Sequence, residues 1–347
     1  MRIARTVSRE TINYETAEDP TPAEGEALIR IHNVTLCGTD LHIWEDDYAT
    51  ELPIIQGHEF AGVIEQINGT SDRFSVGDRI AVSPMFFCGE CYACSIGRVN
   101  ACTHMSVYGC YEDGSLVELM SVPLEKLYPV PDALPMHLAP LSEPMSIAMQ
   151  AVNRGRPVAG ETAVVLGCGP IGLLATLYLT ELGVQVIAAD TVEDRCAFAQ
   201  EFGANETFVV DPSAPFPNEQ QAARIAELTA GQGPSLIIEA TGQPSSLGNA
   251  IQMVATAGRV VQVGISDKLA ELSMRVLPVK EIDLIGSRNS QNLIGESLDL
   301  LGRHVPEATA LVTHTFAFDN LNAAFETMRS RDAVVGKVLI SMPGATI

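Results

Sequence analysis

The sequence predicts an α/β protein with two domains, an antiparallel β-barrel-like domain and a doubly wound parallel sheet. Three observations lead to this prediction. Short alternating runs of apolar and polar residues, separated by glycines and prolines, fill the first part of the chain. Apolar runs of strand length then alternate with helix-length segments, a pattern typical of βαβ units. At 347 residues, the chain also exceeds the length that a single core usually supports.

The first domain is expected to contain short antiparallel strands. Residues 26–31, 62–67 and 78–82 alternate apolar and polar side chains, as strands with one buried face do. Glycines and prolines separate these runs and mark tight connections, for example in segment 19–25. We therefore expect a β-barrel-like domain over residues 1–148.

The second domain is expected to hold a parallel sheet covered by helices on both faces. Its apolar runs are nearly continuous, as in strands that are buried on both sides. The predicted strands are 162–166, 184–189, 207–210, 236–239 and 259–263, with helices from near Ile171 and over 194–202. The alternation of strand-length and helix-length segments ends after residue 287, so we expect the domain to span 149–287.

The last segment, 288–347, carries a different pattern. Two helices are expected at 290–303 and 320–331, followed by a strand at 337–341. We expect this segment to return to the first domain and complete it.

The charge balance argues against two classes of partner. The chain has 21 basic and 43 acidic residues and a formal net charge of −22. Nucleic acids and anionic membranes attract basic surfaces, so we expect neither as a partner. No apolar run approaches the roughly 20 residues that cross a bilayer, and residues 1–6 lack the apolar run of a signal peptide. We expect a cytoplasmic protein.

Four cysteines within a short lobe, at about 86–104, predict a metal site. Cys88, Cys91, Cys94 and Cys102 have the spacing C-x2-C-x2-C-x7-C, which lets a tight loop wrap four sulfurs around one zinc ion. The alternatives are four unrelated buried cysteines, or disulfides, which would require an oxidising compartment. Four protein ligands leave no open coordination position, so we expect a structural zinc ion here.

A glycine-rich loop predicts a dinucleotide site. Residues 167–172 read Gly-Cys-Gly-Pro-Ile-Gly, after a predicted buried strand and before a predicted helix. Gly167 permits the tight turn, Gly169 lets the backbone approach a pyrophosphate, and Gly172 lets helix and strand pack closely. Pro170 and Ile171 start the helix, whose N-terminus attracts phosphate. The alternative is a glycine-rich turn of an unrelated α/β domain.

The residue that ends the next strand bears on the choice of cofactor. Asp190 can accept hydrogen bonds from ribose hydroxyls and would repel a 2′-phosphate, which favours NAD over NADP. Arg195 could soften this preference or pack over the adenine.

A second group of metal-ligating residues leaves one position open. Cys37, His58 and Glu59 supply a thiol, an imidazole and a carboxylate, and three protein ligands are the pattern of a catalytic zinc ion. His58 and Glu59 would point to opposite faces of a regular strand, so both can bind one ion only if the chain turns at Gly57. Glu143 is therefore a competing carboxylate, as a ligand or a partner of bound water. Alternatively, these are ordinary core residues.

Taken together, these residues resemble the zinc-dependent medium-chain alcohol and polyol dehydrogenases. The motifs that carry the resemblance are 37–42, 57–59, the four-cysteine lobe, 142–144 and the glycines of 167–172. This family pairs a GroES-like catalytic domain, completed by the C-terminal tail, with a Rossmann domain. Within it, segments 94–98, 286–289 and 313–316 are most similar to the sugar-acid (hexonate) members of the sorbitol and threonine dehydrogenase branch. Segment 113–118 departs from the pattern of its relatives, which leaves the packing on the substrate side open.

The resemblance implies a zinc-dependent oxidoreductase that transfers a hydride from a secondary alcohol of a polyol or sugar acid to NAD. It implies one catalytic and one structural zinc ion per chain, and a homodimer or homotetramer. Thr39 would take the hydroxyl proton and His42 would relay it to solvent, although both could be ordinary loop residues. The further cofactor-binding residues that we expect are Thr241, Val263, Gly264, Ile265, Ser287 and Arg288.

Several alternatives remain open from the sequence. The substrate could be an amino alcohol such as threonine, or the chain could be a non-catalytic sensor that binds NAD and zinc. Arg288 could grip a carboxylate or phosphate, or lie on the surface. Trp44 could line the pocket or belong to the core.

Overall fold

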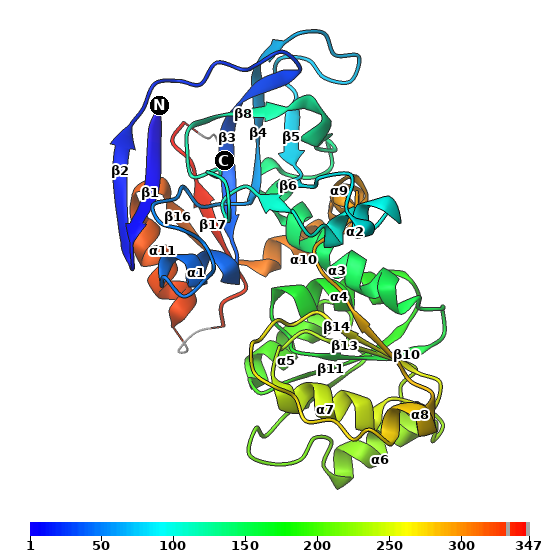
Figure 1. The fold of residues 1–347 in the computed structure, drawn as a ribbon. Coiled ribbons are helices and arrows are strands. Elements are labelled where there is room, and N and C mark those ends of the chain that lie inside the picture. Colours follow the sequence, from blue (N-terminus) through cyan, green and yellow to red (C-terminus); the bar gives the residue numbers. More distant parts are fainter. Residues whose placement is uncertain (331–333, 345–347) are drawn as a thin grey trace. The chain divides into compact units, whose positions relative to one another are not determined.

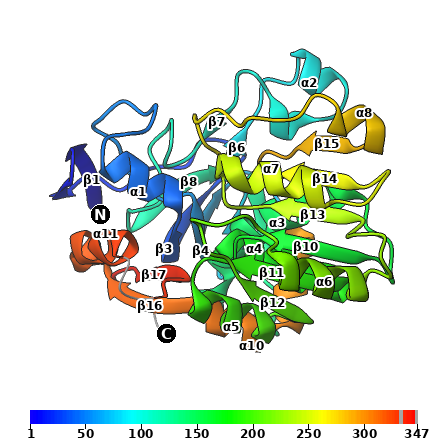
Figure 2. The same ribbon diagram turned by 90° about the horizontal axis from the view of Figure 1, so that it is seen from below.

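The computed structural model describes residues 1–330 and 334–344. The chain forms two compact units, shown in two views in Figures 1 and 2. Unit 1 comprises Met1–Ser146 and Gln291–Ile347, and unit 2 comprises Ile147–Ser290. The chain therefore leaves unit 1, builds unit 2 and returns to unit 1.

Unit 1 is organised around a seven-stranded sheet of order β16-β17-β3-β4-β5-β9, with β8 pairing β3 off this path. The strand pairs are antiparallel except β16 and β17, which are parallel. The strands are β3 (Glu26–Leu36), β4 (Glu59–Asn68), β5 (Arg79–Val82), β8 (Leu119–Pro123), β9 (Leu127–Pro129), β16 (Val312–Ala317) and β17 (Lys337–Ser341). Two separate two-stranded sheets are β1 (Arg2–Ser8) with β2 (Thr11–Thr16), and β6 (Met85–Phe86) with β7 (Ser106–Val107).

The C-terminal segment supplies part of this sheet and its cover. Strand β17 pairs β3 in the register Val338↔Leu36 and Ile340↔Val34. Helix α11 (Leu321–Arg329) contributes Phe325 to the same core. The other helices of unit 1 are α1 (Gly38–Trp44), α2 (Tyr92–Ser95), α9 (Ile294–Arg303) and α10 (Val305–Leu311), with short 3-10 turns at Val99–Ala101, Leu124–Lys126, Met136–Leu141 and Phe318–Asn320.

Unit 2 is a six-stranded parallel sheet of order β12-β11-β10-β13-β14-β15. Helix α4 contacts β10 and β11, whereas α7 contacts β13 and β14, and Figure 1 shows them on opposite faces. The elements are α3 (Ser142–Gly155, which begins in unit 1), β10 (Thr162–Leu166), α4 (Pro170–Glu181), β11 (Gln185–Asp190), α5 (Glu193–Glu201), β12 (Glu206–Val209), α6 (Glu219–Leu228), β13 (Leu236–Glu239), α7 (Pro244–Met253), β14 (Arg259–Gln262), α8 (Val276–Lys280) and β15 (Asp283–Gly286). The strand order reverses between β10 and β13, and such a switch point opens a crevice at the carboxyl ends of the strands.

Two parts of the chain differ from the sequence-based expectation. The helix expected at 290–303 begins only at Ile294, because Asn289 and Asn292 adopt positive φ angles of 46° and 54° that a helix cannot contain. Strands β15 and β16 and helix α10 were not predicted, since they span only four, six and seven residues. The helix expected at 320–331 is α11, and position 331 lies outside the described residues.

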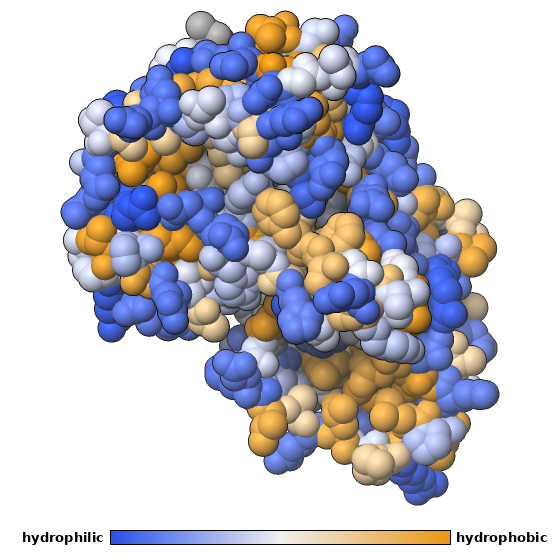
Figure 3. Space-filling view, turned by 45° about the horizontal axis from the view of Figure 1, so that its top comes forward, coloured by the Kyte–Doolittle hydropathy of each residue, from blue (hydrophilic) through white to orange (hydrophobic). Residues whose placement is uncertain are grey.

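Polar residues cover much of the face shown in Figure 3, with apolar residues exposed between them. Within the described ranges, no helix combines the length and the hydropathy needed to cross a membrane.

Candidate functional site

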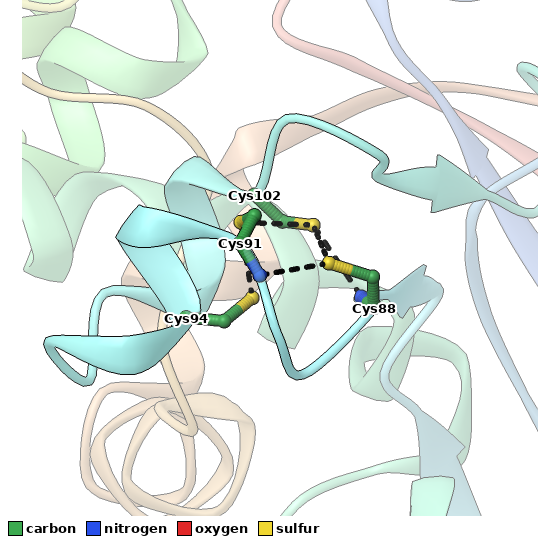
Figure 4. A group of neighbouring side chains, drawn as sticks. All are labelled: Cys88, Cys91, Cys94 and Cys102. Carbon is green, nitrogen blue, oxygen red and sulfur yellow. Dashed lines mark hydrogen bonds between the residues drawn. The ribbon is translucent and has the colours of Figure 1, made fainter.

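The four lobe cysteines converge on one point in unit 1 (Figure 4). The Sγ atom of Cys91 lies 3.5 Å from that of Cys94 and 3.9 Å from that of Cys102, and the sulfurs of Cys88 and Cys102 are 3.5 Å apart. Four sulfurs at about 2.3 Å from a zinc ion would be roughly 3.8 Å apart in a tetrahedron. The spacing of the thiols therefore fits a zinc ion without rearrangement.

Backbone amides favour the thiolate form of this cluster. The amide of Cys91 donates to Sγ of Cys88 at 3.4 Å, and the amide of His104 donates to Sγ of Cys102 at 3.3 Å. A backbone hydrogen bond from Thr103 lowers the pKa of Cys91 to about 5, whereas desolvation and the Cys91 side chain raise the pKa of Cys94 to about 12. Thiolates are the form in which cysteine binds metal.

A second set of donors converges where β3 ends and β4 begins. Ligand atoms of Cys37, His58 and Glu59 all lie within 4.8 Å of one another. Gly57 has a φ of +96°, and a Cβ there would lie 2.7 Å from the Ser115 hydroxyl oxygen, so the turn requires glycine. This turn precedes β4, and His58 therefore lies outside the regular strand.

The carboxylate of Asp40 contacts three of the residues that form this site. Its Oδ2 accepts a hydrogen bond from the Cys37 amide at 2.9 Å, and its Oδ1 accepts one from the Gly57 amide at 3.2 Å. The same carboxylate lies 3.6 Å from Nδ1 of His58, which leaves Nε2 for an ion. Burial by itself lowers the pKa of His58, but Asp40, Cys110 and Cys37 together raise this pKa well above its usual value.

Glu59 is fully buried and held through both carboxylate oxygens. Lys337 of β17 donates to Oε1, and the hydroxyl of Thr35 donates to Oε2. Burial opposes the charge on Lys337, yet the Glu59 carboxylate raises its pKa, so the two form a buried ion pair. The carboxyl group of Glu143 lies at the start of α3 outside the group of three donors, and desolvation together with Glu59 raises its pKa to about 7.

The two residues expected to relay protons lie on α1. Thr39 is half-buried and lies two residues after Cys37, whereas His42 is exposed on the last turn. Nδ1 of His42 lies 2.8 Å from Oδ1 of Asp47.

The glycine loop of unit 2 has the geometry that a phosphate site needs. Gly167 has a φ of +97°, and α4 begins at Pro170, with Ile171 in its first turn. A Cβ on Gly172 would lie 1.8 Å from the carbonyl oxygen of Gly167, so only glycine fits there. At Gly169, by contrast, a Cβ would meet no atom within 4 Å, which leaves open space above the helix N-terminus.

A cavity of about 600 Å³ adjoins this loop. It is lined by Gly167, Gly169, Asp190, Arg195 and Thr241, among others. Asp190 accepts hydrogen bonds from the amides of Cys168 (2.8 Å) and Val192 (3.0 Å), and each of its oxygens keeps a lone pair for a ribose hydroxyl.

A second cavity of about 390 Å³ lies at the ends of β14 and β15. Val263, Gly264, Ile265 and Ser287 contribute to its lining. Among the described residues, the Ser287 hydroxyl and Oε1 of Gln262 are buried there without a hydrogen-bond partner, which suits a polar ligand. Arg288 is exposed and lines neither of these two cavities, and its role stays a prediction.

Comparison with known proteins gives matches along most of the chain. An alcohol dehydrogenase GroES-like domain model matches residues 23–132, and a zinc-binding dehydrogenase model matches residues 170–303. L-galactonate-5-dehydrogenase of Escherichia coli (strain K12) is 33% identical over 334 residues, which cover 94% of each chain. The chain belongs to the zinc-type alcohol dehydrogenase family. The predicted family, fold class and oxidoreductase activity are confirmed.

Two further similar proteins are a relative that is named for another substrate and a solved structure that contains NADH. L-threonine 3-dehydrogenase of Bacillus subtilis (strain 168) is 29% identical over 323 residues, 91% of this chain and 90% of the relative. A solved short chain alcohol dehydrogenase (rspB) from E. coli CFT073, complexed with NADH, has a TM-score of 0.90 and 31% identity, and the match covers 98% of this chain and 99% of that one.

Sequence reasoning missed three residues that organise these sites in the dehydrogenase. Asp40 and Lys337 hold the metal-ligating residues, as described above. Glu239, at the end of β13, accepts hydrogen bonds from the amides of Thr241 (2.9 Å) and Gly242 (3.1 Å). For Glu239, the signal in the sequence was an acidic residue that ends an apolar strand, because a buried charge there needs several donors.

Two other side chains lie in places that the sequence left open. Trp44 belongs to the core, since it is 1% exposed and stacks on Phe325 with ring centroids 5.3 Å apart. Cys110, which the sequence did not single out, is buried, and its Sγ lies 3.7 Å from Nδ1 of His58.

Proposed function

We propose that this alcohol dehydrogenase oxidises a secondary alcohol of a polyol or sugar acid and uses NAD as the hydride acceptor. The observation that carries the proposal is the convergence of Cys37, His58 and Glu59, a donor set that leaves one zinc coordination position for substrate. The relative named L-galactonate-5-dehydrogenase, at 33% identity, supports a sugar-acid substrate.

Residues of this chain would bind the zinc ion and transfer the substrate proton. Cys37, His58 and Glu59 would hold the catalytic zinc ion, whose Lewis acidity favours loss of the substrate hydroxyl proton. Thr39 would accept this proton and His42 would release it to solvent. Glu143, with its raised pKa, would accept or donate a hydrogen bond beside the ion at neutral pH.

The residues around the donor set would keep it in one geometry. Asp40 would fix the ring of His58, and Lys337 would orient Glu59 while neutralising its charge. Cys88, Cys91, Cys94 and Cys102 would hold the structural zinc ion in the lobe.

The preference for NAD is inferred from Asp190. Its carboxylate lines the larger cavity of unit 2 and would repel a 2′-phosphate, whereas Arg195 in the same lining adds one positive charge. The relative solved with NADH, at 31% identity, supports this choice.

A substrate screen tests the proposal. Sugar acids, polyols and threonine are supplied with NAD, and formation of NADH is followed by its absorbance. We expect the highest kcat/KM with a sugar acid or polyol. A clear preference for threonine would instead support the second candidate, an amino-alcohol dehydrogenase, for which the 29% identical threonine 3-dehydrogenase is the supporting observation.

Replacing the thiol of Cys37 tests the catalytic site. We expect Cys37→Ser to lose at least about 100-fold in kcat while the protein still folds, because a hydroxyl is a poor zinc ligand and the lost ion carries the acid chemistry. Circular dichroism and thermal unfolding control for folding. Unchanged turnover in this variant would refute the assignment of Cys37 as a ligand.

The oligomeric state and the cellular compartment of the protein are inferred from general features of the chain. We infer a homodimer or homotetramer, supported by the edge strand β15 of unit 2 and by the exposed side chains of Ile265, Leu269 and Met274. We infer a reducing compartment such as the cytoplasm from the four-cysteine lobe, whose thiols must stay reduced to bind zinc.

A further inference from the structure

The exposed end of α1 holds a carboxylate against the imidazole of His42. Oδ1 of Asp47 lies 2.8 Å from Nδ1 of His42, and the two side chains are 55% and 57% exposed. Glu45 offers a second carboxylate oxygen within 4.8 Å of this pair, but it also lies 3.9 Å from Arg329. Asp47 is therefore the carboxylate that makes the short contact with the ring.

The backbone fixes Asp47 next to His42. The amide of Asp47 donates to the carbonyl oxygen of His42 at 3.0 Å, and the amide of Asp46 donates to that of Ile43 at 3.1 Å. Asp46 has a φ of 56°, so these bonds form the Schellman motif that ends a helix in a left-handed residue. The motif brings the side chain of its last residue back to the final turn, and the contact does not depend on a flexible loop.

A carboxylate next to Nδ1 determines which tautomer the neutral imidazole adopts. The neutral imidazole then carries its hydrogen on Nδ1, where the carboxylate accepts it, and the lone pair stays on Nε2. A proton that reaches Nε2 produces an imidazolium, which the same carboxylate stabilises. Without the carboxylate, the ring can rotate and exchange its tautomers, so Nε2 is available only part of the time.

We propose that Asp47 is a positioning residue that holds His42 in the Nδ1–H tautomer and keeps Nε2 as the proton acceptor of the relay. The proposal rests on the function proposed above, in which His42 passes the substrate proton to solvent. Both side chains are well exposed, so water competes with the contact and its effect is moderate.

The test compares Asp47→Asn with the matched control Asp46→Asn. The control removes the same charge from the neighbouring residue, and asparagine tolerates the left-handed conformation at position 46. At position 47, the amide NH₂ can donate to Nδ1 and favour the opposite tautomer. We expect Asp47→Asn to lower kcat about fivefold and to change KM for the alcohol less than about twofold. This loss in kcat is small compared with the whole rate enhancement that a proton relay contributes. Asp46→Asn should match the wild type.

A double-mutant cycle separates positioning from other effects. In the His42→Asn background, Asp47→Asn should lower kcat no further, because the residue that it positions is gone. An equal loss of kcat in both backgrounds would overturn the proposal, as would a wild-type kcat in the single variant Asp47→Asn. An unchanged kcat in His42→Asn would also overturn it, because no relay would then exist to position.

A spectroscopic arm is independent of turnover. Long-range ¹H–¹⁵N spectra of the wild type should show His42 as the Nδ1–H tautomer, and Asp47→Asn should shift this signal toward the Nε2–H form, with thermal unfolding unchanged. The same tautomer in both proteins would overturn the proposal. A wild type without any dehydrogenase activity would refute the proposed function, and the spectra would then still decide whether Asp47 sets the tautomer.

Discussion

Gly169 and Gly172 lie in one loop, yet a methyl group would meet very different surroundings at the two positions. On Gly172 it would lie 1.8 Å from the carbonyl oxygen of Gly167, whereas on Gly169 it would meet nothing within 4 Å. Gly172 therefore serves the packing of α4 against the strand, and Gly169 keeps space free for a ligand. One motif thus combines a folding requirement with a binding requirement.

Alanine at each position should separate these requirements. We expect Gly172→Ala to lower the free energy of unfolding by about 3 kcal/mol, because backbone must move to admit the methyl group. Gly169→Ala should unfold like the wild type but bind NAD about tenfold more weakly, since the methyl group would occupy the path of the pyrophosphate. Urea unfolding and calorimetric titration with NAD measure the two effects. Equal affinity for NAD in Gly169→Ala would contradict the assigned role of this loop.

At the scale of elements, β17 does more than close the sheet of unit 1. It carries Lys337, whose Nζ donates to Glu59 at the start of β4 and to the carbonyl oxygen of Leu36 at 3.3 Å. Lys337 is 4% exposed and Glu59 is fully buried, so neither charge can be satisfied by water. The strand therefore delivers the counter-charge on which the buried carboxylate depends.

Removing this counter-charge should be costly. We expect Lys337→Met to lower the free energy of unfolding by about 3–5 kcal/mol, because it leaves a buried carboxylate unpaired. The double variant Lys337→Met with Glu59→Gln should recover a large part of this loss. Urea unfolding of both variants, measured without added zinc, tests the expectation. A double variant as unstable as the single one would show that packing, and not charge, accounts for the effect.

What the sequence could predict depended on how far apart the partners lie. The four lobe cysteines fall within fifteen positions, so their spacing alone indicated a metal site. The loop at 167–172 was likewise readable because its strand, turn and helix are consecutive. By contrast, Lys337 and Glu59 are 278 positions apart, and only the pairing of β17 with β3 brings them together. Local spacing was therefore enough to predict the metal-ligating residues. The residues that support them could be identified only from the fold.

For the whole molecule, the two groups of donors predict the metal content. Both groups have the chemistry of a zinc site, one with four thiols and one with mixed donors. We expect about two zinc ions per chain in the wild type and about one in either Cys37→Ser or Cys94→Ser.

Mass-spectrometric metal analysis of dialysed protein measures this content. The two variants serve as controls for each other, since each should lose a different ion. Only one zinc ion in the wild type, retained in Cys37→Ser, would mean that the mixed group binds no zinc and would favour a sensor over an enzyme.

The discontinuous build of unit 1 also sets an order of events on the ribosome. Unit 2 is encoded without interruption, so it can fold while the last residues of unit 1 are still being translated. Lys337 of strand β17 is translated 278 positions after Glu59, and until it emerges Glu59 lacks the cation with which it pairs. The nascent chain therefore carries an unfinished metal site until all of unit 2 has been translated, and the arrival of one lysine completes it.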